Sequence, residues 1–141
     1  VDPNNDYSKK IIKKLNCLNK HDYRIIEFEE DILSLYKCFD LFIHIPKQGA
    51  FEAFGQTYIE SMLSRVPTIF SKSGIANEVC KNRVNTYFCN PNNIYSIVEG
   101  IIFHEKNRKN SLLITKNAYF RAKDKFNLDD HFSKLYHTYY L

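Results

Sequence analysis

Residues 40–63 read DLFIHIPKQGAFEAFGQTYIESML. The first seven form a nearly continuous apolar run closed by Pro46, which is typical of a strand buried on both faces of a parallel sheet. A loop containing Gly55 follows, and an apolar pattern with helical spacing begins at about Gln56 and runs to about Ser64. A strand, a loop and a helix in this order predict one unit of an α/β fold.

Strand patterns and helical patterns alternate on both sides of this stretch. Besides the strand at 40–46, β-branched and aromatic residues predict strands at 23–28, 66–70 and 86–89. Amphipathic spacing and capping residues predict helices at 6–20, 31–37, 73–80, 93–104 and 105–141, the last broken near 126–127. This alternation with short connections predicts a Rossmann-like α/β fold, an open parallel sheet with helices on both faces.

The composition narrows the class of protein. A chain of 141 residues with 44% hydrophobic and 15% aromatic residues fits one globular domain. Its net charge of +4 gives no reason to expect nucleic acid as a partner. Basic residues concentrate between 105 and 125, which indicates a solvated helix face or, alternatively, a patch for anionic lipid or a charged substrate.

The cysteines and the N-terminus suggest a cellular location. Cys17, Cys38, Cys80 and Cys89 have neither C-x-x-C pairing nor zinc-ligand spacing, which predicts four reduced, mostly buried thiols in a cytoplasmic protein. The first residues contain no hydrophobic signal region, and no apolar run approaches the roughly 20 residues that span a bilayer. The histidines are scattered, so we expect no metal site. The chain lacks an initiating Met and is interpreted as a fragment or a processed product.

Glu52 and Glu60 flank the turn that opens the helix at Gln56. In an open parallel sheet ligands bind beyond the carboxyl ends of the strands, and the free N–H groups of a helix N-terminus attract phosphate. Gly55 lets the backbone approach closely, and Thr57 adds a hydroxyl. Because carboxylates accept hydrogen bonds from sugar hydroxyls, the combination predicts a nucleotide sugar. The spacing alone favours two surface acids stabilised by the helix macrodipole.

Five motifs carry a resemblance to a known family. Residues 40–79 contain, in order, DLFIHIP, FEAFG, IESML, VPTIF and GIANEV. This series resembles the C-terminal domain of retaining GT-B glycosyltransferases of family 4, the glycosyl transferases group 1 family. The similarity extends over nearly the whole chain, and the family's E-x₇-E pair falls in register as Glu52 and Glu60.

The resemblance implies roles for individual residues. The diphosphate of the donor would lie against the turn and the first residues of the helix, at Phe54, Gly55, Gln56 and Thr57. Glu60 would bind the ribose, and Glu52 would contact the donor sugar as the catalytic residue. No metal and no cofactor are implied, because helix N–H groups and cations can hold the departing diphosphate.

The sequence also departs from the family pattern. The family usually has glycine at five positions that are occupied here by Glu27, Arg65, Ser73, Arg83 and Thr86. We expect remodelled loops there, or strain of about 1 kcal/mol or more at any of them held at positive φ. The family's diphosphate-neutralising Arg and Lys would precede this sequence. The chain is therefore expected to lack its first strand–helix unit and the N-terminal acceptor domain.

Residues 1–141 are thus interpreted as a single nucleotide-sugar-binding domain of a retaining hexosyltransferase in glycan or glycolipid biosynthesis, with a nucleoside diphosphate sugar as partner. The alternative is a non-catalytic or degenerate module that binds a sugar nucleotide or a protein. A glycoside hydrolase using Glu52 and Glu60 is disfavoured, because nothing else in the sequence builds a sugar cleft. The expected location is the cytoplasm, and a peripheral contact with the inner membrane surface is left open.

Overall fold

The computed structural model describes residues 5–46 and 52–140, and the chain divides after Ile32 into two compact units. In the first unit, helix α1 (Asp6–Leu15) begins after Asn5, whose side chain accepts a hydrogen bond from the Tyr7 N–H at 2.9 Å. Helix α1 ends earlier than the predicted residue 20 because a turn follows Asn16.

The strand predicted at residues 23–28 is wrong. This segment is irregular, and the side chains of Ile25, Ile26 and Phe28 are exposed. β-branched and aromatic residues favour a strand only where packing and a neighbouring strand support it. The prediction rested on composition alone, and no strand pairs with this segment in the described part of the chain.

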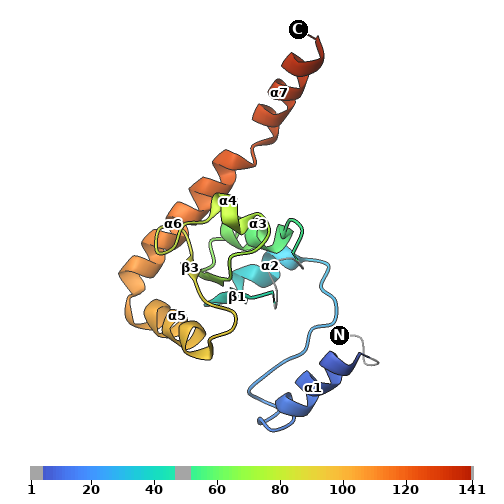
Figure 1. Ribbon diagram of the computed structural model, residues 1–141, viewed down its shortest axis with the longest axis vertical. Helices are drawn as coiled ribbons and strands as arrows, with labels where there is room; N and C mark the ends of the chain where they lie inside the picture. Colours follow the sequence, from blue (N-terminus) through green and yellow to red (C-terminus); the bar gives the residue numbers. More distant parts are fainter. Residues whose placement is uncertain (1–4, 47–51, 141) are drawn as a thin grey trace. The chain divides into compact units, whose positions relative to one another are not determined.

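The second unit contains a parallel sheet of three strands in the order β1 (Phe42–His44), β2 (Thr68–Phe70) and β3 (Tyr87–Phe88) (Figure 1). Ile69 of β2 stands opposite Ile43 of β1 and Tyr87 of β3. The predicted α/β class and parallel pairing are confirmed, although each strand is shorter than predicted. The parallel direction brings the carboxyl ends of all three strands to one edge of the sheet.

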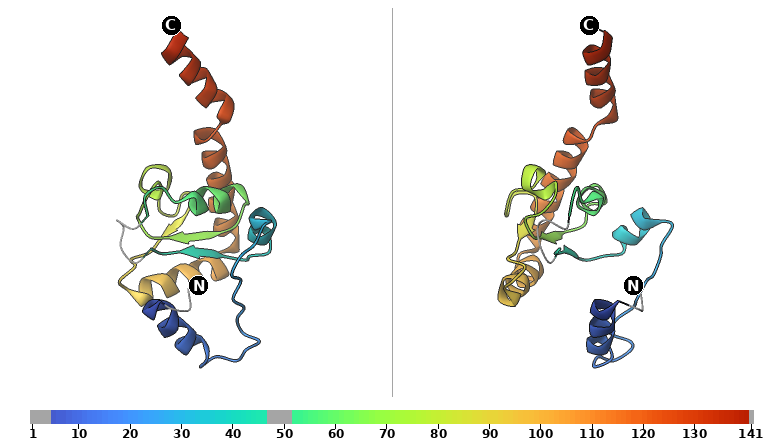
Figure 2. Two further views of the ribbon diagram at one scale, coloured as in Figure 1. Left: turned by 90° about the vertical axis from the view of Figure 1, so that its right-hand side faces the viewer. Right: turned by 45° about the vertical axis from the view of Figure 1, so that its right-hand side comes forward.

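Helices cover both faces of this sheet. Phe70 packs in a core cluster supplied by three helices, α3 (Gln56–Leu63), α4 (Ala76–Val79) and α6 (Arg108–Lys125). Its neighbour Ile69 packs in a second cluster that includes Ile97 and Phe103 of α5 (Ile94–Lys106). Because successive side chains of a strand point to opposite faces, α3 and α5 lie on opposite sides of the sheet, as Figure 2 shows.

The remaining helices follow the predicted pattern closely. Helix α2 (Ile32–Lys37) precedes β1, and α7 (Leu128–Tyr140) follows α6 after a break at Phe126 and Asn127. The side chain of Asn93 caps α5 by accepting the Tyr95 N–H at 3.0 Å. No helix in residues 5–46 and 52–140 is long and apolar enough to cross a membrane.

Two of the five positions where the family has glycine keep a positive φ, namely Arg65 at 59° and Arg83 at 57°. Arg65 follows α3 and donates its N–H to Met62 O, while the Val66 N–H reaches Ser61 O. This C-terminal motif usually places glycine where Arg65 stands. The Arg65 guanidinium lies 4.0 Å from the centroid of the Tyr119 ring, a cation–π contact that offsets part of the strain.

The other positions have no positive φ and therefore no strain of this kind. The backbone of Ser73 and Thr86 is not in the left-handed region. Thr86 is fully buried, and its hydroxyl bonds the hydroxyl of Thr68 at 2.9 Å across the sheet. The positive φ in the turn after β2 falls instead on Gly74, at 48°.

The cysteine prediction is half correct. Cys80 and Cys89 are buried, whereas Cys17 and Cys38 are exposed, and all four are free thiols. Burial raises the pKa of Cys80 to about 12, so this thiol stays protonated and unreactive at neutral pH.

Candidate functional site

Helix α3 begins directly after residues 52–55, the described end of the loop between β1 and α3. Its N-cap residue is Gly55, with φ 85° and ψ 65°, which has no side chain to cap the helix. The first N–H groups of a helix have no intrahelical acceptor, so the backbone at Gln56 and Thr57 is suited to an anion. Only glycine fits at position 55, since a Cβ there would lie 2.5 Å from the Tyr58 ring.

The loop before α3 is joined to the turn after β2. The Ile75 N–H donates to Phe54 O at 2.8 Å. A Cβ on Gly74 would lie 2.6 Å from Phe54 O and 3.0 Å from Cγ of Glu52, which explains why glycine occupies this position. The two loops therefore form one structural unit at the carboxyl ends of β1 and β2. Phe51, the first residue of the FEAFG motif, lies outside the described residues.

Glu52 stands in this unit and is partly buried. Its Oε2 accepts a hydrogen bond from Nε2 of His44, the last residue of β1, at 3.0 Å. His44 was not among the residues predicted for the site. A polar residue at the end of an otherwise apolar strand was the signal that could have found it.

Glu60 has a different partner. The Tyr36 hydroxyl, on α2, donates to Oε2 of Glu60 at 3.2 Å. Burial raises the pKa of Tyr36 well above its usual value, and the negative charge of Glu60 and the hydrogen bond between them raise it further. Tyr36 is therefore a permanent donor at neutral pH. The two predicted glutamates thus have different hydrogen-bond partners, His44 for Glu52 and Tyr36 for Glu60.

Two buried hydroxyls at this edge of the sheet make no hydrogen bond within the described residues. They are Oγ1 of Thr57, in the first turn of α3, and Oγ of Ser71, directly after β2. Buried polar groups are nearly always paired, so a bound ligand is a natural source of partners for both. The hydroxyls of Ser73 and Tyr58 are paired with each other at 2.5 Å.

A cation is present at the same edge. Lys72 follows Ser71 in the turn after β2, is exposed, and places its Nζ 5.8 Å from the centroid of the Phe88 ring. Lys72 was not among the predicted site residues either. In the part of the chain that the structure describes, no three His, Cys, Asp or Glu side chains are grouped as metal ligands.

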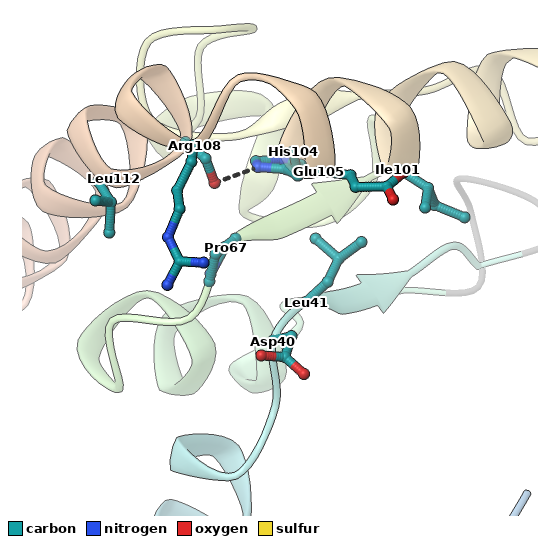
Figure 3. A pocket seen from close by; sticks show the side chains of 9 residues that line it. Asp40, Leu41, Pro67, Ile101, His104, Glu105, Arg108 and Leu112 are labelled. Carbon is teal, nitrogen blue, oxygen red and sulfur yellow. Dashed lines mark hydrogen bonds between the residues drawn. The ribbon is translucent and has the colours of Figure 1, made fainter.

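A pocket of about 400 Å³ lies at the opposite edge, where Asp40, Leu41 and Pro67 precede β1 and β2 (Figure 3). Helices α5 and α6 supply the rest of its lining, and His104 Nδ1 bonds Ser111 Oγ at 2.7 Å there. Burial lowers the pKa of His104, so its ring is neutral. None of the predicted site residues lines this largely apolar pocket.

Comparison with known sequences points to one family. The sequence profile described as Glycosyl transferases group 1 matches residues 2–121. A sucrose synthase of Thermosynechococcus vestitus (strain NIES-2133 / IAM M-273 / BP-1) is 36% identical over 52 residues. That match covers 37% of this chain and 6% of the sucrose synthase.

Solved structures share the fold. The structure of the Anabaena protein Alr3699/HepE in complex with UDP-glucose resembles this chain with a TM-score of 0.86 at 23% identity. The C-terminal domain of the group 1 family protein LpcC from Francisella tularensis gives a TM-score of 0.73 at 21% identity. The similarity to HepE covers 97% of this chain but 37% of HepE, and that to LpcC covers 89% and 65%. This chain therefore spans well under half of the length of HepE.

Proposed function

Because the chain belongs to the glycosyl transferases group 1 family, we propose that it is the nucleotide-sugar-binding domain of a GT-B glycosyltransferase. In the complete enzyme this domain would work together with a separate domain that binds the acceptor. Two likenesses support this reading. HepE is more than twice as long as the matched stretch, and the matched LpcC structure is a C-terminal domain.

The main structural support for this proposal is the N-terminus of α3. Its N-cap residue is Gly55, which holds the left-handed conformation and has no side chain to cap the helix, and the Thr57 hydroxyl beside it has no hydrogen-bond partner among residues 5–46 and 52–140. The diphosphate of the donor would accept hydrogen bonds from the N–H groups of Gly55, Gln56 and Thr57. Lys72 would supply positive charge from the turn after β2.

The glutamates would bind the hydroxyl groups of the donor. Glu60 would accept hydrogen bonds from the ribose, and Glu52 from the transferred sugar, because ionised carboxylates are strong acceptors for hydroxyls. The UDP-glucose complex of HepE, a protein of the same fold, supports a nucleoside diphosphate sugar as the ligand class.

The proposed reaction of the complete enzyme is transfer of a hexosyl group with retention, in glycan or glycolipid biosynthesis. The role of this domain is to bind and orient the donor. Its helix N–H groups and Lys72 would stabilise the negative charge that develops on the departing diphosphate, which requires no metal ion in principle.

Calorimetric titration of the 141-residue chain with UDP, GDP and uridine tests the phosphate assignment. We expect UDP or GDP to bind more tightly than uridine, and Lys72→Gln to weaken diphosphate binding while leaving uridine binding unchanged. Lys37→Gln, on an exposed position of α2, is the matched control. Equal affinities for a nucleoside and its diphosphate would contradict the assignment.

Turnover separates the enzyme from the alternative, a module that binds a sugar nucleotide without reaction. We expect no sugar transfer by residues 1–141 alone, because a domain that only binds the donor would need a second domain to hold the acceptor. We expect transfer once an acceptor domain is supplied in the same chain. Nucleotide binding without transfer in such a longer chain would favour the module.

We further propose a cytoplasmic location with a peripheral contact at the inner membrane surface. Lys109, Lys116 and Lys123 recur every seven residues on α6, and the exposed Leu113 and Phe120 lie between them on the same face. Basic and apolar side chains on one helix face suit anionic lipid. The four free thiols suit a reducing compartment.

Vesicle sedimentation tests the membrane contact. We expect the chain to sediment with phosphatidylglycerol vesicles and not with phosphatidylcholine vesicles, and the triple change of Lys109, Lys116 and Lys123 to Gln to release it. The matched control changes three lysines of α1, namely Lys10, Lys13 and Lys14. Equal loss of sedimentation in both triple variants would show nonspecific charge attraction and remove the α6 assignment.

A further inference from the structure

The hydrogen bond between His44 and Glu52 links the last residue of β1 to the loop before α3. Nε2 of the imidazole and Oε2 of the carboxylate are 3.0 Å apart, and the two side chains are 27% and 24% exposed. We propose that His44 is the positioning residue of Glu52, which holds the carboxylate in the orientation that accepts a hydroxyl of the donor sugar. This inference rests on the proposed function of Glu52.

The imidazole itself has a fixed orientation. Its ring lies parallel to that of Phe42, with an interplanar angle of 5° and centroids 6.2 Å apart. The edge of the Tyr58 ring meets it at a centroid distance of 5.0 Å and an angle of 75°. Tyr58 is fully buried and Phe42 belongs to β1, so both contacts come from well-packed parts of the fold. The N–H of His44 therefore points in one direction.

The stem of Glu52 is confined by the two glycines. A Cβ added to Gly55 or to Gly74 would lie 3.1 or 3.0 Å from Cγ of Glu52, so the glutamate stem runs close past both residues. Packing of the stem does not fix the plane of the carboxylate, because the last torsion of a glutamate side chain is broad. The hydrogen bond from His44 restricts that last torsion.

A carboxylate has about four acceptor positions on its two oxygens, so the bond to His44 leaves capacity for a sugar hydroxyl. An acceptor that is already oriented loses less conformational freedom when the ligand binds. The benefit is expected only for a ligand that carries the sugar. Affinity for the bare nucleoside diphosphate, which is proposed to contact α3 and Glu60, is expected to be independent of His44.

Two variants separate a positioning role from a packing role. His44→Phe keeps a ring for Phe42 and Tyr58 but removes the N–H donor. His44→Gln removes the ring but keeps an N–H donor at similar reach. If His44 matters only for packing, His44→Phe should bind UDP-glucose better than His44→Gln does. If His44 positions Glu52, His44→Gln should bind UDP-glucose better than His44→Phe does.

The experiment is calorimetric titration of the 141-residue chain and both variants with UDP and with UDP-glucose. We expect His44→Phe to weaken UDP-glucose binding about tenfold, which corresponds to about 1.4 kcal/mol. UDP binding should stay unchanged in both variants, and His44→Gln should restore most of the UDP-glucose affinity. The ¹³Cδ resonance of Glu52, recorded without ligand, should shift in His44→Phe and return in His44→Gln, while that of Glu60 stays constant as the control.

Different results overturn different statements. If the wild-type chain binds both ligands and His44→Phe binds them equally well, the positioning role is wrong while the proposed function stands. The same conclusion follows if His44→Gln loses as much UDP-glucose affinity as His44→Phe, or if the Glu52 resonance is unmoved. If the wild-type chain binds neither ligand, the proposed function fails and the positioning role fails with it.

Discussion

Glu52 and Glu60 belong to one sequence motif, but different kinds of structure hold them. Glu60 lies on α3, where helix geometry sets its position, and its partner is the buried Tyr36 hydroxyl at 3.2 Å. Glu52 lies in a loop, passes close to two glycines, and is bonded to His44 at 3.0 Å. The position of Glu60 thus depends mainly on its own helix, whereas that of Glu52 depends on residues far apart in the sequence.

Because their supports differ, the two glutamates are sensitive to substitutions in different parts of the fold. A change in the turn after β2 should disturb Glu52 and spare Glu60, because Gly74 touches the Glu52 loop and not the middle of α3. A change in α2 should do the reverse, because Tyr36 touches Glu60.

Gly74→Ala is expected to have the largest effect. Alanine would be strained at φ 48°, and its Cβ would overlap Phe54 O, which already accepts the Ile75 N–H. We expect the free energy of unfolding, measured by urea titration, to fall by about 3 kcal/mol. Ala53→Gly, at an exposed position of the same loop, is the control and should change it by less than about 0.5 kcal/mol. A stable Gly74→Ala variant would show that the two loops move independently.

Glu60→Ala should give the next largest effect, on binding rather than folding. If Glu60 accepts hydrogen bonds from ribose, its loss should weaken UDP binding by about 1.5–3 kcal/mol, the range for hydrogen bonds to charged groups. Glu52→Ala should leave UDP affinity almost unchanged and weaken only the binding of UDP-glucose. Titration of both variants with both ligands measures the four affinities.

The two variants serve as controls for each other. UDP tests only the proposed contact of Glu60 with the ribose, whereas UDP-glucose also tests the proposed contact of Glu52 with the sugar. Equal losses for UDP in both variants would show that the glutamates act on the same part of the donor. Unchanged affinities in all four titrations would mean that both are ordinary charges near a helix start and that the ligand binds elsewhere.

The two glutamates also show what the sequence can and cannot predict. The strand, loop and helix around them follow from local patterns, and the motif spacing placed Glu60 on a helix as found. The partners Tyr36 and His44 were not predicted, because each contact joins segments whose proximity depends on how α2, β1 and α3 pack together. The wrong strand at 23–28 has the same origin, since pairing with a neighbour is not encoded in composition.

Tyr36→Phe should have a moderate effect that depends on pH. It removes the hydroxyl bonded to Glu60, so we expect the free energy of unfolding near pH 7 to fall by about 1 kcal/mol. The pKa of Tyr36 is raised in the folded state by burial and by Glu60. Above pH 10 the unfolded chain releases this proton while the folded chain keeps it, so the contribution of Tyr36 is complete below pH 10 and declines above it.

Urea titrations of wild type and Tyr36→Phe between pH 7 and pH 11 measure this dependence. We expect the stability difference between them to shrink as the pH rises above 10, because only the wild type carries the Tyr36 proton. Tyr95→Phe, at an exposed tyrosine, is the control and should show no such trend. A constant difference at all pH values would show that the Tyr36 pKa is not shifted by its surroundings.

Phe54→Leu should have the smallest effect, although Phe54 lies in the turn proposed to bind the diphosphate. Its backbone carbonyl joins the loops at 2.8 Å from the Ile75 nitrogen, but its half-exposed side chain meets Phe126 edge-on, with centroids 6.2 Å apart. If the turn binds phosphate through its backbone, UDP affinity should change by less than about 0.5 kcal/mol, the scale of ordinary surface substitutions. Stability should fall by no more than about 0.5 kcal/mol, the lower end of the range for an aromatic pair, because the Phe54 ring is half exposed. A large loss of UDP affinity, measured by calorimetry, would mean that the ring itself contacts the ligand, and the turn would then have to be assigned to base stacking.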